Sequence, residues 1–288
     1  MGTMQVTIIG LGLIGGSIGL ALRKTKWQGL EIVGYAHRPQ TAALALKLGA
    51  VNRTELSLKR AAANANLVII STPVLNIRQI LSEMATYLPP DCVVTDTAST
   101  KLQVMKWAEE LLPPTASFIG GHPMAGKETS GIETAEADLF QGCTYCLIPT
   151  AKASPKAIKT VVEVVEKVGA APLFINAQEH DNLVAAVSHL PALLSAALIS
   201  ATTKNTRWQR MSKLAAGGYR DVTRLASGNA KINTHICLTN QEAILYWMDE
   251  FIKELERLRQ LVADGNEELE EVLAQASEAR RKWLEKQR

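Results

Sequence analysis

The sequence predicts an α/β fold, in which a mostly parallel sheet with helices on both faces is followed by an all-helical domain. Three observations predict it. Short apolar runs bounded by turn residues alternate with longer helical patterns up to about residue 176. A glycine-rich loop joins the first apolar run to the first helical pattern. After Asn176 only helical periodicity remains. We therefore expect two domains, 1–176 and 177–288.

The elements of the first domain follow from this alternation. The strand candidates are 5–10, 31–36, 67–72, 92–97, 117–121, 145–150 and 172–176. The helices expected between them cover 13–24, 39–49, 75–87, 100–111 and 155–168. Strands joined in this way through helices pair mostly in parallel.

The second domain is expected to contain helices over 178–203, 207–216, 238–263 and 266–286, with a broken region near 217–234. Apolar residues recur every three or four positions along 238–263, so one apolar stripe runs its length. They are Leu245, Met248, Ile252, Leu255, Leu258 and Val262. Two explanations remain open for the stripe, namely packing within the same chain or a helical core shared by a homodimer.

Composition excludes several function classes. The chain has 31 basic and 28 acidic residues, and the net charge of +3 is too small and dispersed for a nucleic-acid partner. The start of the chain lacks the pattern of a secretory leader and of a myristoylation site. No apolar segment is expected to approach the length that crosses a bilayer. These observations predict a cytoplasmic protein without a membrane partner.

The four cysteines favour a structural role. Only "CTYC" at 143–146 has metal-like spacing, and on a strand residues three apart face opposite sides. No second Cys or His pair lies nearby, so we expect small, mostly buried side chains in a reducing compartment and no metal.

"GLGLIGG" predicts a dinucleotide site, because it follows the first strand directly and opens a helix. Gly10 permits the tight turn, Gly12 lets the backbone approach a pyrophosphate, and Gly15 allows close helix–sheet packing in a Rossmann-type domain. The cofactor contacts that we assign also include Leu13, Ile14, Ser71 and Thr72.

The end of the second strand predicts NADP as the cofactor. NAD-binding domains carry an Asp or Glu there to bind the ribose 2′-hydroxyl, whereas this strand ends in Ala36 and His37, followed by Arg38. A guanidinium binds a 2′-phosphate that a carboxylate would repel. We assign His37 and Arg38 to this end of the cofactor.

Two polar residues follow neighbouring strands at the rim where ligands of open parallel sheets bind. Ser99 ends "VVTDTAS", and we also expect it to cap the helix that Thr100 and Lys101 open. His122 lies between Gly121 and Pro123, with little to pack on. Its near-neutral pKa suits proton transfer.

The chain resembles the prephenate/arogenate dehydrogenase family of tyrosine biosynthesis. The resemblance rests on "GLGLIGGS", "TDTASTK", "GGHPMAG", "SHLP" and "YRDVTRLASGN", in that order over nearly the whole chain. It implies a nucleotide-binding domain joined to a helical dimerisation domain, and hence a homodimer. It also implies the reaction: hydride leaves C4 of a cyclohexadienol for the nicotinamide, the ring carboxylate departs as carbon dioxide, and the ring becomes aromatic.

The resemblance assigns the roles as well. His122 is the catalytic histidine that hydrogen-bonds the 4-hydroxyl, and Ser99 helps to orient that hydroxyl. Lys101 matches a substrate-binding position, although a lysine on a first helical turn is as often a solvated charge.

Three residues of the helical domain are implicated in substrate binding or in its support. His189 lies in an apolar helical pattern, where a histidine is more often a core residue, but Pro191 should kink the helix there and the family uses this histidine at the substrate. Arg220 and Arg224 share one helical face. The resemblance places the substrate carboxylate on Arg224 and leaves Arg220 structural.

One departure favours arogenate over prephenate. Where many prephenate-using relatives carry a Trp, this chain has Asn233. With the NADP pattern, this resembles the NADP-linked, arogenate-specific members. The alternatives are a prephenate dehydrogenase with the same residues, a β-hydroxyacid dehydrogenase whose lysine would be Lys204, Lys213 or Lys231, and a non-catalytic NADP sensor.

Overall fold

The sheet has the strand order β3-β2-β1-β4-β5-β6-β7-β8 in the computed structural model, which describes residues 4–286. All neighbouring strands pair in parallel except β6 and β7, which are antiparallel. The strands are β1 (Met4–Ile9), β2 (Leu30–Tyr35), β3 (Arg53–Glu55), β4 (Leu67–Ile70), β5 (Val93–Asp96), β6 (Ser117–Pro123), β7 (Thr144–Pro149) and β8 (Ala171–Phe174). The predicted mostly parallel sheet is confirmed.

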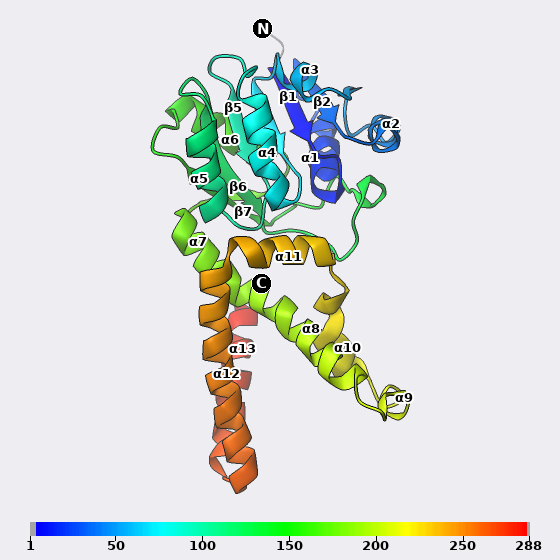
Figure 1. Ribbon diagram of the computed structural model, residues 1–288, viewed down its shortest axis with the longest axis vertical. Helices are drawn as coiled ribbons and strands as arrows, with labels where there is room; N and C mark the ends of the chain where they lie inside the picture. The colour runs from blue at the N-terminus through cyan, green and yellow to red at the C-terminus, as the bar shows by residue number, and fades with distance from the viewer. Residues whose placement is uncertain (1–3, 287–288) are drawn as a thin grey trace. The chain divides into compact units, whose positions relative to one another are not determined.

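Helices cover both faces of this sheet, with α4 and α5 lying side by side on one face (Figure 1). The helices are α1 (Leu13–Lys24), α2 (Pro39–Lys47), α3 (Leu58–Ala62), α4 (Val74–Met84), α5 (Leu102–Leu111) and α6 (Pro155–Lys167). Because side chains alternate along a strand, Ile8 packs into the core shared with α1 and α6, while Ile9 packs into the core shared with α4 and α5. Both are fully buried.

The sequence analysis missed the short elements β3 and α3 of the sheet domain. β3 has no apolar run, and ion pairs stabilise it instead. Arg53 Nε contacts Glu31 of β2 at 2.8 Å, and Arg53 Nη1 contacts Glu55 at 3.0 Å. A three-residue polar edge strand has no period-2 apolar pattern to detect.

Among residues 4–286 only helices follow β8, as predicted, although helices also occupy 217–223 and 230–239, where a broken region was expected. The helices after β8 are α7 (Ala177–Val184), α8 (Leu190–Thr203), α9 (Trp208–Met211), α10 (Gly217–Thr223), α11 (Ala230–Thr239), α12 (Gln241–Asp264) and α13 (Glu268–Glu285). A π-helical turn, Ala185–His189, separates α7 from α8 just before Pro191. It confirms the predicted distortion, because Pro191 has no backbone N–H to continue the ladder.

The expectation that no segment could span a bilayer is wrong in terms of length and composition. The helical run Ala177–Thr203 has 27 residues, and an 18-residue window within it has a mean hydropathy of 1.9. A single helix of this kind is weak evidence for a membrane protein. The run is also broken by the π turn and contains His180 and Asp181, which are buried and hydrogen-bonded.

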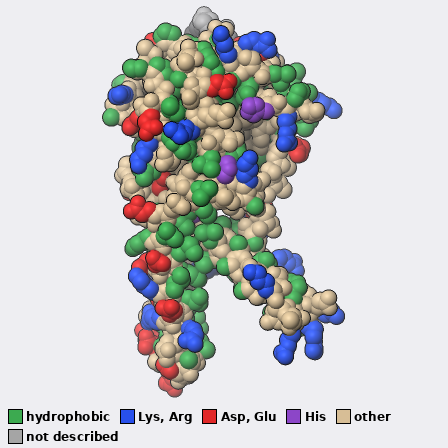
Figure 2. Space-filling model, in the orientation of Figure 1, with side chains coloured by type: hydrophobic (Ala, Val, Ile, Leu, Met, Phe, Trp, Pro, Cys, Tyr) green, Lys and Arg blue, Asp and Glu red, His purple; other side chains and the backbone are tan. Residues whose placement is uncertain are grey.

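The chain forms two compact units, Met1–Gln241 and Glu242–Arg288. In the second unit α12 and α13 form a hairpin, in which Arg257 Nη2 contacts Glu268 at 3.0 Å. Its surface is rich in apolar groups (Figure 2). Exposed members of the stripe on α12 include Leu245, Ile252, Leu255 and Val262. The predicted domain boundary at 176/177 stays a prediction.

Candidate active site

The glycine-rich loop has the shape that a pyrophosphate requires. Gly10 adopts φ +97°, and a Cβ there would lie 2.4 Å from the Ser71 carbonyl oxygen. A Cβ on Gly15 would lie 2.1 Å from the Gly10 oxygen, whereas one on Gly12 would meet nothing within 4 Å. Gly12 is the N-cap of α1 and supplies no side-chain cap, so the first N–H groups of the helix are free for an anion. The residues therefore fit a dinucleotide.

A groove of about 470 Å³ runs from this loop along the ends of β4 and β5. Gly12, Leu13, Ile14, Ser71, Thr72 and Ser99 line it, together with 125–127 and 129–131 of the segment after β6. The Thr72 hydroxyl is buried without a partner among residues 4–286, which leaves it free for a ligand. The structure thus brings Ser99 together with most of the predicted cofactor residues.

A smaller pocket of about 150 Å³ lies beside the glycine-rich loop, lined by Gly10, Tyr35, His37 and Thr72 among others. His37 Nδ1 lies 3.2 Å from the Tyr35 hydroxyl. Arg38 precedes α2 as its N-cap residue, is exposed, and does not line the pocket. Glu83 of α4 does line it. Sequence reasoning missed this carboxylate because it lies 47 positions after Ala36, on a different element.

Beneath Ser99, a buried ion pair ties β5 to β6. The Asp96 carboxylate accepts hydrogen bonds from the backbone N–H of Ala98 at 2.8 Å and of Gly121 at 3.1 Å. The Lys101 ammonium bonds the same carboxylate and donates to the Gly121 carbonyl at 2.7 Å. Burial lowers the pKa of Lys101, and Asp96 opposes that shift. A solvated Lys101 is therefore excluded, and its predicted contact with substrate stays a prediction.

The predicted capping role of Ser99 is wrong. Helix α5 begins at Leu102, and no side chain of its own segment caps it. Instead the Asp181 carboxylate of α7 accepts from the N–H groups of Lys101 at 2.7 Å and Leu102 at 2.8 Å. A capping residue 80 positions away leaves no local pattern in the sequence. The sequence therefore predicted Ser99 as the cap of α5, whereas Asp181 caps it.

His122 lies near the end of β6, where the chain leaves the sheet toward the groove. The glycines before it are required by packing, because a Cβ on Gly121 would lie 2.4 Å from the Asp96 oxygen. The imidazole is 8% exposed, and its Nδ1 lies 2.9 Å from His180 Nε2. Burial, aided by His180, Lys101 and His189, lowers the pKa of His122 well below its usual value. At neutral pH the ring is uncharged and able to accept a proton.

His189 ends the π turn and is 4% exposed. Asn240 Nδ2 lies 3.3 Å from its Nδ1, so Nδ1 is the acceptor and Nε2 carries the proton. That Nε2 has no partner among residues 4–286. The ring lines an apolar pocket of about 240 Å³. Burial lowers its pKa to about 4. A buried, unpaired N–H on a residue that lines a pocket is a candidate donor to a ligand oxygen.

Arg224 lines an open groove of about 530 Å³ and forms an ion pair there with Glu128. This groove shares Gly126, Lys127 and Asn229 with the 470 Å³ groove beside the glycine-rich loop, called the nucleotide groove below. It shares Ser188 and Asn233 with the His189 pocket. The three spaces are thus contiguous. Arg220, by contrast, is exposed and lines none of them.

Comparisons with known proteins identify the family. The family model for the nucleotide-binding domain of prephenate dehydrogenase matches residues 18–173, and that for its dimerization domain matches 176–275. The chain belongs to the prephenate dehydrogenase family. Prephenate dehydrogenase of Bacillus subtilis is 35% identical over 272 residues, which cover 93% of this chain and 73% of that protein.

Solved structures of the family have the same fold. Prephenate dehydrogenase of A. aeolicus, in complex with hydroxyphenyl propionate and NAD+, has a TM-score of 0.90 at 31% identity, covering 98% of this chain and 99% of that one. Arogenate dehydrogenase of Synechocystis has a TM-score of 0.82 at 31% identity, covering 97% and 100%. These matches confirm the resemblance and the Rossmann-type fold followed by a helical domain.

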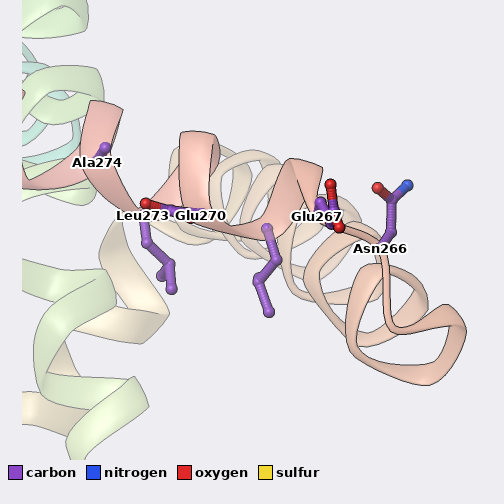
Figure 3. A pocket seen from close by; sticks show the side chains of 6 residues that line it. Asn266, Glu267, Glu270, Leu273 and Ala274 are labelled. Atoms are coloured by element: carbon purple, nitrogen blue, oxygen red, sulfur yellow. The ribbon is translucent and has the colours of Figure 1, made fainter.

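Two further features of the described residues lie outside the predicted site. All four cysteines are free thiols, and residues 4–286 contain no cluster of three potential metal-ligating side chains. A separate hollow near the turn between α12 and α13 lies wholly within the second unit, where the Leu273 side chain projects from α13 (Figure 3). None of the predicted site residues lines it.

Proposed function

We propose that this chain is an NADP-dependent arogenate dehydrogenase, which converts arogenate to tyrosine by oxidative decarboxylation. The observation that carries the proposal is the pairing of Arg224 with Glu128 in a groove contiguous with the nucleotide groove. A guanidinium and a carboxylate side by side complement the carboxylate and the ammonium of an amino-acid side chain. Prephenate carries a keto oxygen in place of that ammonium.

The chain's own residues divide the work of the reaction. When bound, the nicotinamide accepts the hydride from C4. His122, uncharged at neutral pH, takes the proton of the 4-hydroxyl as the hydride leaves. The bond to the ring carboxylate then breaks as carbon dioxide departs, and its electron pair completes the aromatic ring. The proton on His122 returns to the phenolate oxygen, so the base is not consumed.

Ser99 and His189 orient the substrate in this scheme. Ser99 lines the nucleotide groove and is placed to hold the 4-hydroxyl. The unpaired Nε2–H of His189 is placed to donate to an oxygen of the substrate from its own pocket. Fixing the substrate against the nicotinamide in this way supplies much of the rate enhancement.

A prephenate dehydrogenase with the same residues in the same roles is the second candidate. It is favoured by the name of the Bacillus subtilis relative and by the A. aeolicus structure. Asn233, which lines both the Arg224 groove and the His189 pocket in place of the family's Trp, favours arogenate.

The choice of NADP is supported by the end of β2. No carboxylate directly follows Tyr35; His37 lines the pocket there, and the exposed Arg38 is the next residue in the chain. Glu83 lines the same pocket from α4 and would oppose a phosphate. We further infer a homodimer, since the second family model is that of a dimerization domain. A cytoplasmic location is the expectation from the sequence.

Four assays test the proposal, with arogenate or prephenate as substrate and NADP or NAD as cofactor, each followed by the absorbance of the reduced cofactor. The highest kcat/KM is expected for arogenate with NADP. A higher kcat/KM for prephenate would establish the second candidate. A higher kcat/KM with NAD would overturn the NADP preference inferred from the residues after β2.

His122→Asn tests the proposed base. The amide keeps polarity but cannot take the proton, so kcat should fall by about 10²–10⁴-fold, the usual range for a positioned general base. Binding of NADP, measured by fluorescence titration, should stay within about threefold of the parent. A kcat within a few-fold of the parent would rule out the role.

A further inference from the structure

We propose that His180 and Asp181 of α7 position His122 as the base by fixing which of its ring nitrogens carries a proton. The three side chains form one buried chain of hydrogen bonds. His122 Nδ1 lies 2.9 Å from His180 Nε2, and His180 Nδ1 lies 2.8 Å from Asp181 Oδ1. His180 and Asp181 are each 1% exposed. Neither residue was singled out by the sequence analysis.

The direction of the chain follows from Asp181. Both oxygens of its carboxylate already accept backbone N–H groups, Oδ1 that of Lys101 and Oδ2 that of Leu102, so the carboxylate acts as the acceptor toward His180 as well. His180 Nδ1 then donates to it, and with one ring proton His180 has Nε2 as an acceptor. His122 Nδ1 must then donate to His180. The proton of the neutral His122 is thus held on Nδ1, and Nε2 keeps its lone pair.

The same arrangement stabilises His122 after it has taken a proton. The positive ring would donate through Nδ1 to His180, which in turn donates to the Asp181 carboxylate. Among residues 4–286 no other group bonds a ring nitrogen of His122. The logic is that of the carboxylate in a Ser-His-Asp triad, extended by one imidazole.

Asp181 is held rigidly enough for this role. The Asp181 carboxylate caps α5, and the Asp181 backbone carbonyl accepts a hydrogen bond from Asn240 Nδ2 at 2.8 Å. The same Asn240 amide contacts His189. One residue therefore links α5 to both histidines predicted at the substrate: the Asp181 carboxylate reaches His122 through His180, and the Asp181 backbone carbonyl reaches His189 through Asn240. His180 and Asp181 are positioning residues, because both act through His122. Like His122 itself, neither lines a groove described above.

The inference rests on the proposed role of His122, but its first test needs no turnover. The chain has five histidines, so ¹⁵N-histidine labelling gives a resolvable set of ring signals, and His122→Asn identifies those of His122. At pH 7.5 we expect a protonated Nδ1 and a bare Nε2 on His122. Finding the proton on Nε2 would overturn the proposal, since His180 would then be the donor.

Kinetics of substituted enzymes provide the second test. His180→Leu removes the acceptor, so kcat should fall by about 10²–10³-fold with KM within about threefold. His180→Gln offers an amide oxygen in its place and should keep kcat within about tenfold of the parent. Asp181→Asn should lower kcat at least as much as His180→Leu, because it reverses the tautomer of His180. His235→Gln, outside the chain of bonds, is the control for loss of a histidine.

The outcomes separate this proposal from the proposed function. Equal kcat for His180→Leu and His180→Gln, with the control unchanged, would overturn it. If His180→Leu does not fold, as judged by circular dichroism, the tautomer of His122 in the parent decides. If the parent oxidises neither dienol, the proposed function fails and the tautomer measurement still stands.

Discussion

At the scale of single residues, Arg224 is expected to act on binding rather than on turnover. A guanidinium that holds a carboxylate far from C4 contributes equally to the ground state and the transition state. Arg224→Gln should therefore raise KM for the dienol by about 10–100-fold, with kcat within a few-fold, in steady-state assays. Arg220→Gln is the matched control on the same helical segment. Equal KM values for the two variants would refute the assignment.

His189 makes a prediction about pH and stability. Its pKa of about 4 in the fold lies below the value of 6.5 expected when unfolded, so between these values the unfolded chain binds more protons. The free energy of unfolding should fall as pH drops through this window, by about 2 kcal/mol at pH 5 for this group alone. It should be insensitive to His189 above about pH 7.5.

Urea unfolding at pH 7.5, 6 and 5 measures this effect. His122, which burial also shifts downward, adds a loss of the same sign. His189→Gln should have a shallower pH dependence than the parent, and an identical slope would contradict the prediction.

At the scale of elements, the Lys101 side chain connects β5, β6 and the start of α5 through an ion pair and a hydrogen bond. Its ammonium is fully buried against Asp96 and the Gly121 carbonyl. Lys101→Met fills the same space but leaves Asp96 charged and unpaired, which typically costs about 3–5 kcal/mol. We expect a loss of that size in the free energy of unfolding, measured by urea titration. The matched double variant Lys101→Met with Asp96→Asn should recover part of it, and no recovery would count against the ion pair as the cause.

At the scale of the whole molecule, the exposed apolar stripe of α12 is the expected dimer contact. Leu255 is 53% exposed in the single chain, and Leu245, Ile252 and Val262 of the same stripe are exposed as well. A buried glutamate at such a contact would be unpaired and costly. Leu255→Glu should therefore shift the sedimentation-equilibrium mass from two chains toward one. Lys253→Glu, on the opposite side of the helix, should not, and a monomeric parent would refute the dimer.

Much of the fold could be predicted from the sequence because the signals are local. Alternating apolar runs and the glycine-rich loop placed seven of the eight strands found within residues 4–286, and the helix predicted at 13–24 matches α1. The edge strand β3 escaped because ion pairs, rather than an apolar pattern, hold it. The expectation that no apolar segment is long enough to cross a bilayer failed, because the helical run from α7 to α8 meets that length and composition.

The sequence by itself determined the family and the glycine-rich turn, and it proposed His122 and Arg224 as site residues, because these motifs are local in the chain. Only the tertiary structure decided their partners. Asp181 caps α5 from 80 positions away, and Glu128 meets Arg224 from 96 positions away. Hydrogen bonds and ion pairs depend on distance in space, which sequence separation does not report. For that reason the groups that set the tautomer of His122 became visible only in the folded chain.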